Sequence, residues 1–122
     1  MADILIVEDD KDLNNAYKII LENEGHNVVS VFNGQEALKE LENFEPQLIL
    51  LDLLMPVMDG RQFLRKYDNQ RNIPVVVLSN LDGKKDIEQL LKLGASNYLV
   101  KSAIDPTTLV TIVKATLATK KG

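Results

Sequence analysis

The sequence predicts an α/β protein built on a doubly wound, five-stranded parallel sheet, with helices covering both faces in a three-layer sandwich. Short aliphatic runs bounded by polar residues or proline occupy residues 4–7, 48–51 and 75–78, as is typical of strands buried on both faces. Amphipathic segments lie between these runs, so strands and helices alternate strictly along the chain. Right-handed crossovers then bring the strands together in parallel and place helices on both sides of the sheet.

The remaining elements follow from apolar spacing and from residues that favour helix ends. Two mixed runs at residues 28–32 and 98–100 complete the five strands, and their composition favours the edges of the sheet. Helical spacing predicts helices around residues 13–21, 37–41, 63–67, 87–91 and 109–117. We expect Gly25 and Gly94 to end two of these helices, Asp59 to cap the third, and Pro106 to lie in the first turn of the last.

The composition is that of one globular domain, which we expect to span residues 1–122. Apolar residues make up 45% of the chain and charged residues 26%, which is ordinary for a folded domain. The net charge of −4 argues against direct binding of nucleic acid, because neutralising phosphates requires a basic surface. The chain has no cysteine and no apolar run near the ~20 residues of a membrane span. We therefore expect a cytoplasmic protein with no membrane segment.

Polar and charged residues follow the predicted strands at the points where the strands end. In chain order they are Glu8 and Asp9, Asp52, Ser79 and Lys101. Ligands of a doubly wound sheet bind outside the carboxyl ends of its strands, where the strand order reverses. We therefore expect these side chains to form one site at that edge.

A group of carboxylates at this edge predicts a site for a divalent cation. Neighbouring carboxylates repel one another, and one takes up a proton unless a cation lies among them. A few oxygen ligands, with room for water and a phosphate oxygen, suit Mg²⁺, or Mn²⁺ in its place. Asp52 is the candidate nucleophile, and Lys101 is the cation that can meet a phosphoryl oxygen. Asp10 is either a further acid of this group or the N-cap of the first helix, and we favour capping.

The same residues resemble a known family, the receiver domain of two-component response regulators. The resemblance covers the whole chain, through the segments ILIVEDD, LDLLMPVMDG, VVLSN and NYLVK. It implies the flavodoxin-like fold with strand order 2-1-3-4-5. It also implies a phosphoacceptor of a phosphorelay that catalyses only its own phosphorylation and slow dephosphorylation, and is not an enzyme in the usual sense.

The resemblance implies a metal-binding and phosphoacceptor role for four residues. Glu8 and Asp9 match the acidic pair that holds Mg²⁺, with Asp9 as a direct ligand. Asp52 matches the phosphoacceptor, which is also a metal ligand. The main-chain carbonyl of Leu54 matches the third protein ligand.

Three further residues match the part of the family site that responds to the phosphoryl group. Ser79 matches the hydroxyl that moves to hydrogen-bond it, and Lys101 matches the lysine that pairs with it. Tyr98 matches the aromatic residue whose rotamer follows that hydroxyl. The implied donor is a phosphohistidine of a sensor histidine kinase or a histidine phosphotransfer protein. The implied output is a changed surface around the last two strands and helices that controls a downstream protein, in a monomer or weak homodimer.

The sequence departs from the commonest family pattern beside two of these site residues. Ser102 follows Lys101 where the family usually has proline after a cis bond. Asn80 follows the switch hydroxyl where the family usually has a smaller residue, and its size leaves open whether Tyr98 can change rotamer.

Leu54 and Leu81 occupy the two positions that flank the phosphoryl group in the family. Polar side chains at these positions can orient the water that hydrolyses the aspartyl phosphate. Two leucines instead predict that water is excluded, and hence that the aspartyl phosphate is long-lived.

Three other functions share part of this pattern. A haloacid-dehalogenase-type phosphatase also uses a strand-end aspartate and Mg²⁺, but needs a second aspartate where this chain has Leu54. A flavin-binding module would need a hydroxyl- and glycine-rich loop after the first strand, where this chain reads EDDKD. A degenerate receiver that serves only as a docking module would normally have lost some of the acids or the lysine, and none is missing.

Overall fold

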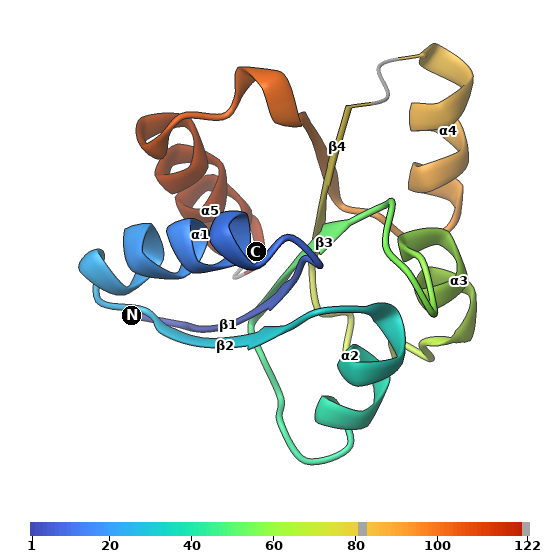
Figure 1. Cartoon of the computed structure of the whole chain (residues 1–122), viewed down its shortest axis with the longest axis horizontal. Helices are drawn as coiled ribbons and strands as arrows, with labels where there is room; N and C mark the ends of the chain where they lie inside the picture. Colours follow the sequence, from blue (N-terminus) through green and yellow to red (C-terminus); the bar gives the residue numbers. More distant parts are fainter. Residues whose placement is uncertain (81–82, 121–122) are drawn as a thin grey trace.

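The computed structural model of this chain describes residues 1–80 and 83–120. Within these residues, five strands form one parallel sheet in the order β2-β1-β3-β4-β5 (Figure 1). The strands are β1 (Asp3–Val7), β2 (Asn27–Val31), β3 (Leu48–Asp52), β4 (Val75–Ser79) and β5 (Asn97–Val100). This arrangement confirms the predicted doubly wound fold, its strand order and the edge positions of β2 and β5.

Helices connect the strands throughout the described chain. They are α1 (Lys11–Asn23), α2 (Gly34–Glu40), α3 (Gly60–Lys66), α4 (Lys84–Lys92) and α5 (Pro106–Lys120), with a 3₁₀ turn, η1 (Lys101–Ala103), after β5. All five of these α-helices begin two or three residues before the apolar spacing predicts. Apolar spacing cannot reveal a first turn made of polar residues or glycine, which N-capping stabilises.

The predicted helix ends are confirmed at several positions. Asp59 caps α3, because its side chain accepts the backbone N–H of Gln62 at 2.9 Å. Gly25 and Gly94 follow α1 and α4 with φ of +90° and +112°, the left-handed conformation that glycine adopts most readily. Pro106 is the first residue of α5.

The sheet is covered on both faces, and successive strand residues alternate between the two cores. Helices α1 and α5 lie on one face, and α2, α3 and α4 lie on the other (Figure 1). Ile4 and Ile6 pack with the first layer, whereas Leu5 and Val7 pack with the second. Every residue of β3 and β4 is buried, which explains why these strands read as continuous aliphatic runs. Among the described residues, no helix is long and apolar enough to cross a bilayer.

The start of α3 lies unusually close to the end of β3. The N–H of Gly60 donates to the carbonyl of Leu53 at 2.8 Å, and a Cβ at Gly60 would lie 2.7 Å from the carbonyl oxygen of Asp52. Such a distance is shorter than van der Waals contact allows, so the close approach requires glycine. This packing holds the loop that follows Asp52 against the strand.

Candidate functional site

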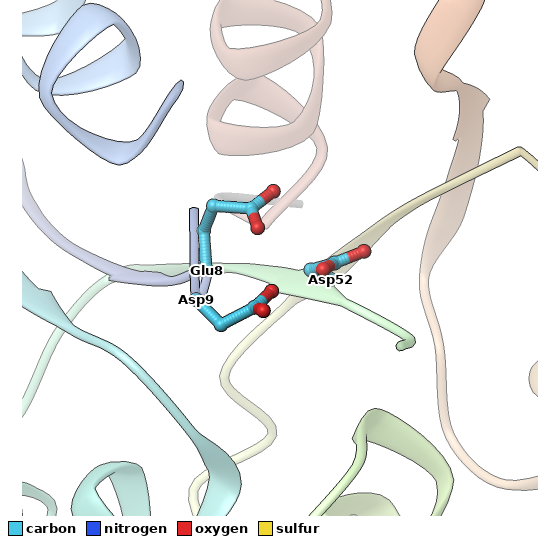
Figure 2. A group of neighbouring side chains, drawn as sticks. All are labelled: Glu8, Asp9 and Asp52. Atoms are coloured by element: carbon cyan, nitrogen blue, oxygen red, sulfur yellow. The ribbon is translucent and has the colours of Figure 1, made fainter. Parts of the chain in front are cut away.

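Parallel register brings the ends of β1 and β3 level with each other, and their acidic residues meet there. Val7 pairs with Leu51, so Glu8 and Asp52 each follow directly after paired residues. Glu8, Asp9 and Asp52 can each offer one carboxylate oxygen within 4.8 Å of the others. Figure 2 shows the three side chains together, with the carboxylates of Glu8 and Asp9 on the side of their backbone that faces Asp52. The structure therefore brings together the carboxylates that the sequence singled out.

Lys101 joins two of these carboxylates. Its Nζ lies 2.7 Å from Oε1 of Glu8 and 3.0 Å from Oδ1 of Asp52. Lys101 is the first residue of η1, directly after β5, and its side chain is only 18% exposed. The peptide bond between Lys101 and Ser102 is trans, so the lysine reaches the carboxylates without the cis bond that is usual in the family.

Burial changes the acid–base behaviour of all three partners. Glu8 and Asp52 are 1% and 3% exposed. Burial raises the pKa of Glu8 to about 7, although the hydrogen bond from Lys101 acts in the opposite direction. Burial likewise raises the pKa of Asp52 against the effect of Lys101. For Lys101, burial lowers the pKa, but the hydrogen bonds to both carboxylates outweigh it and the net shift is upward.

The charges of this group favour a divalent cation. Three carboxylates face one ammonium group, so full ionisation leaves an excess of negative charge in a partly buried place. Burial raises the pKa of Glu8 and of Asp52, so the charged forms of these carboxylates are less favourable here than in water. Hard oxygen donors in small number, one of them on the exposed Asp9, fit Mg²⁺ with part of its water shell retained.

Asp10 has the capping role that we favoured. Its side chain accepts the N–H of Leu13 at 3.0 Å and so caps α1. Its own N–H donates to Oε2 of Glu8 at 3.1 Å. Asp10 thus supports the acidic pair through its main chain, while its carboxylate serves the helix.

The other predicted site residues lie around this group. Ser79 is the last residue of β4 and is buried. Tyr98 lies on β5 and is partly buried, and its hydroxyl is enclosed with no hydrogen-bond partner among the described residues. Leu54 follows β3 with its side chain 66% exposed. Leu81 lies outside the described residues.

Two features of the site were missed from the sequence. The first is the pairing of Glu8 with Lys101, because sequence separation gives no measure of which acid a strand-end lysine will reach. The second is Asn14, which is buried under α1 and bonded to the main chain of Glu8. Asn14 precedes Tyr17 by three residues and Leu21 by seven, so a polar residue on the buried face of the helix was a readable signal.

The fold and the site place this chain among doubly wound α/β domains that carry an acidic cluster and a lysine at the carboxyl edge of the sheet. The sequence places the chain within one family of this class. A family model for the response regulator receiver domain matches residues 4–114. The chain belongs to this family, and it is a receiver domain of two-component systems.

The chain is also similar to curated proteins, one of which is named a response regulator. The chain is 37% identical over 98 residues to the response regulator protein GraR of Staphylococcus epidermidis, a match that covers 80% of this chain and 44% of the relative. It is 34% identical over 115 residues to an uncharacterized 14.6 kDa protein of Leptolyngbya boryana, covering 92% of this chain and 87% of that protein. The chain therefore spans less than half the length of GraR but most of the second relative.

Solved structures agree in fold over the whole chain. A two-component response regulator from Clostridium difficile superposes with a TM-score of 0.92 at 27% identity, covering 100% of both chains. The receiver domain of a signal transduction histidine kinase from Syntrophus aciditrophicus superposes with a TM-score of 0.85 at 36% identity, covering 97% of this chain and 91% of that one.

Proposed function

We propose that this receiver domain accepts a phosphoryl group on Asp52 from a phosphohistidine of a sensor histidine kinase or a histidine phosphotransfer protein. The main support is the placement of Asp52 at the end of a buried strand, 3.0 Å from Lys101 Nζ and within 4.8 Å of two further carboxylates. A rigid strand holds the nucleophile in position, and positioning supplies much of the catalysis in phosphoryl transfer. The proposed domain comprises residues 1–122, with a cytoplasmic setting.

Asp9, Asp52 and the main-chain carbonyl of Leu54 are the proposed direct ligands of Mg²⁺. Both oxygens of Glu8 already accept protein hydrogen bonds, from Lys101 at 2.7 Å and from the N–H of Asp10 at 3.1 Å. Glu8 is therefore better placed to hold the metal through a water molecule than directly. When bound, Mg²⁺ supplies positive charge that offsets the carboxylates and the phosphoryl oxygens.

The transfer itself requires a nucleophile and a fixed cation from this chain. An oxygen of Asp52 attacks the phosphorus, the phosphorus–nitrogen bond to the donor imidazole breaks, and the imidazole leaves and takes up a proton. Lys101 neutralises a phosphoryl oxygen as a point charge. Since Nζ bonds to both Glu8 and Asp52, part of this pairing is exchanged for the incoming phosphoryl group.

Ser79 and Tyr98 are the proposed switch residues. Ser79 follows Leu78, the residue paired with Asp52, so its hydroxyl is one position beyond the phosphoacceptor on the neighbouring strand. The hydroxyl of Tyr98 is enclosed and has no hydrogen-bond partner among the described residues. A change of rotamer is therefore a way for this hydroxyl to gain a partner. We propose that phosphorylation draws Ser79 inward and that Tyr98 follows, changing the α4-β5-α5 surface that controls a downstream protein. The unphosphorylated domain is proposed to be a monomer or weak homodimer.

Incubation with acetyl phosphate and Mg²⁺, followed by intact mass measurement, tests this function. We expect the gain of one phosphoryl group, and no gain in Asp52→Asn. Turnover of a phosphomonoester would instead indicate a haloacid-dehalogenase-type phosphatase. A chain that stays unmodified with an activated donor and metal would indicate a docking module and would overturn the proposal.

The exposed Leu54 leads to a second expectation about the phosphorylated protein. An apolar side chain beside the phosphoryl group provides no hydrogen bond to orient an attacking water. We therefore expect slow loss of phosphate from the phosphorylated chain and faster loss from Leu54→Asn or Leu54→Glu. Phosphate release after removal of the donor measures both rates, and a lifetime of seconds in the wild-type chain would contradict the expectation.

A further inference from the structure

Asn14 connects the first helix to the strand ends that carry the acidic pair. It is 1% exposed, and its Nδ2 donates to the carbonyl of Glu8 at 2.9 Å and to the carbonyl of Val31 at 3.0 Å. The carbonyl of Val31 also accepts the N–H of Glu8 at 3.2 Å. One amide group thus joins α1, β1 and β2 at the point where Glu8 and Asp9 leave the sheet.

The chemistry of these contacts identifies which end of the amide is required. Both neighbours are carbonyl oxygens, so only the NH₂ group of Asn14 can face them. The Oδ1 atom of Asn14 is buried without a hydrogen-bond partner among the described residues. A buried polar atom without a partner is unfavourable. The two hydrogen bonds that the NH₂ group donates explain why the protein tolerates the unpaired Oδ1 of Asn14.

We propose that Asn14 is a positioning residue for the divalent cation, acting through the main chain of the acidic pair. By holding the carbonyl of Glu8, Asn14 sets the direction in which the Glu8 side chain reaches Lys101 and in which the next residue, Asp9, presents its carboxylate. Outer residues that orient metal ligands influence affinity without touching the metal. This inference rests on the proposed function, because it assumes that the carboxylates hold Mg²⁺.

The substitution Asn14→Leu tests the inference, because it keeps the size of the side chain and removes the donor. Asn15→Leu is the matched control, since Asn15 is the exposed neighbour on the same helix. Calorimetric titration with Mg²⁺ measures the dissociation constant of each folded variant. We expect Asn14→Leu to bind Mg²⁺ about tenfold more weakly than wild type, and Asn15→Leu to match wild type.

A second control separates positioning from a general loss of stability. Val113 is buried on α5 in the same core layer and contributes nothing to the acidic pair, so Val113→Ala should lower the unfolding temperature while leaving the Mg²⁺ dissociation constant unchanged. If Asn14→Leu does not fold, Asn14→Ser tests the same point. The serine side chain is too short to reach both carbonyls, and it disturbs the packing less than leucine. Wild-type affinity in the folded Asn14 variant, or equal weakening in Val113→Ala, would overturn the positioning role alone. Absence of Mg²⁺ binding by the wild-type chain would overturn the proposed function together with it.

Discussion

At the scale of single residues, burial dominates the chemistry of the site. Glu8 has a strong partner in Lys101, yet its pKa is raised to about 7 because the carboxylate is almost completely removed from water. Asp52 shows the same direction for the same reason. Two buried carboxylates lower the stability of the folded chain, yet both are kept at the edge of the sheet. Such pairs are common at functional sites, where a ligand supplies the missing positive charge.

A residue far from this site provides a test of how protonation affects stability. His26 accepts the N–H of Ala2 at Nδ1 over 3.0 Å, and burial, followed by the nearby amino terminus, lowers its pKa below 6.5. The unfolded chain then binds more protons than the folded chain as the pH falls below 6.5. The stability that neutral His26 contributes is present above this pH and is lost as the pH falls through the lower, folded pKa.

We therefore expect wild type to lose more stability than His26→Gln when the pH is lowered from about 7.5 to about 5.5. Glutamine does not titrate, so the difference between the two proteins isolates the histidine from the carboxylates that titrate in the same range. Urea denaturation at both pH values measures the effect. An equal loss in the two proteins would show that His26 titrates alike in the folded and unfolded chains.

At the scale of elements, the helices differ in how firmly they are held. In the described chain, Leu90 is the fully buried residue of α4, and the helix is also linked to α3 by Arg61. The guanidinium of Arg61 donates to Gln89 at 2.9 Å and lies 3.4 Å from Asp86. Exposed pairs of this kind contribute about 0–1 kcal/mol. α4 is thus weakly anchored, which suits its place in the surface that we propose to change on phosphorylation.

The start of α3 is held much more tightly, and this gives a prediction for Gly60. A methyl group at this position would meet the carbonyl oxygen of Asp52 at 2.7 Å and the Cα of Leu53 at 2.9 Å. Neither main-chain atom can rotate away, so Gly60→Ala must displace the loop after β3. We expect a loss of about 1–3 kcal/mol in the free energy of unfolding, measured by urea denaturation.

Gly83→Ala is the matched control for this substitution. The new methyl group would lie 3.0 Å from a carboxylate oxygen of Asp86, which is the end of a flexible side chain. The expected loss is therefore smaller than at Gly60. Equal losses of stability in Gly60→Ala and Gly83→Ala would show that the close approach to β3 does not explain why position 60 requires glycine.

At the scale of the whole molecule, the acidic group links metal binding to folding. A cation bound to the folded chain and not to the unfolded chain stabilises it by RT ln(1 + [L]/Kd), which is roughly 1–2 kcal/mol when [L] is about five to thirty times Kd. We expect millimolar Mg²⁺ to raise the unfolding temperature of wild type, and Asp9→Asn to remove most of this rise. Thermal unfolding with and without the metal measures it, and Asp12→Asn, an exposed neighbour on α1, should respond like wild type. No response in wild type would count against the metal site.

Much of this molecule was predictable from local sequence. Strands β1, β3 and β4 are continuous aliphatic runs because both of their faces are buried, and this pattern identified them and the α/β class. The residues at their ends were equally readable, since a charged residue that follows a buried strand must lie at the edge of the sheet. The resemblance to receiver domains then supplied the strand order, which no periodicity determines.

Hydrophobic pattern and chain order were enough to predict the elements, the layers and the acids and lysine at one edge of the sheet. The folded structure was needed to show that Lys101 joins Glu8 to Asp52, that Asp10 caps α1, and that Asn14 holds the main chain beneath the acidic pair. These contacts depend on distances of a few ångströms between side chains of separate elements. Such distances are set by the packing of the whole sheet and its helices, and no local pattern of residues records them.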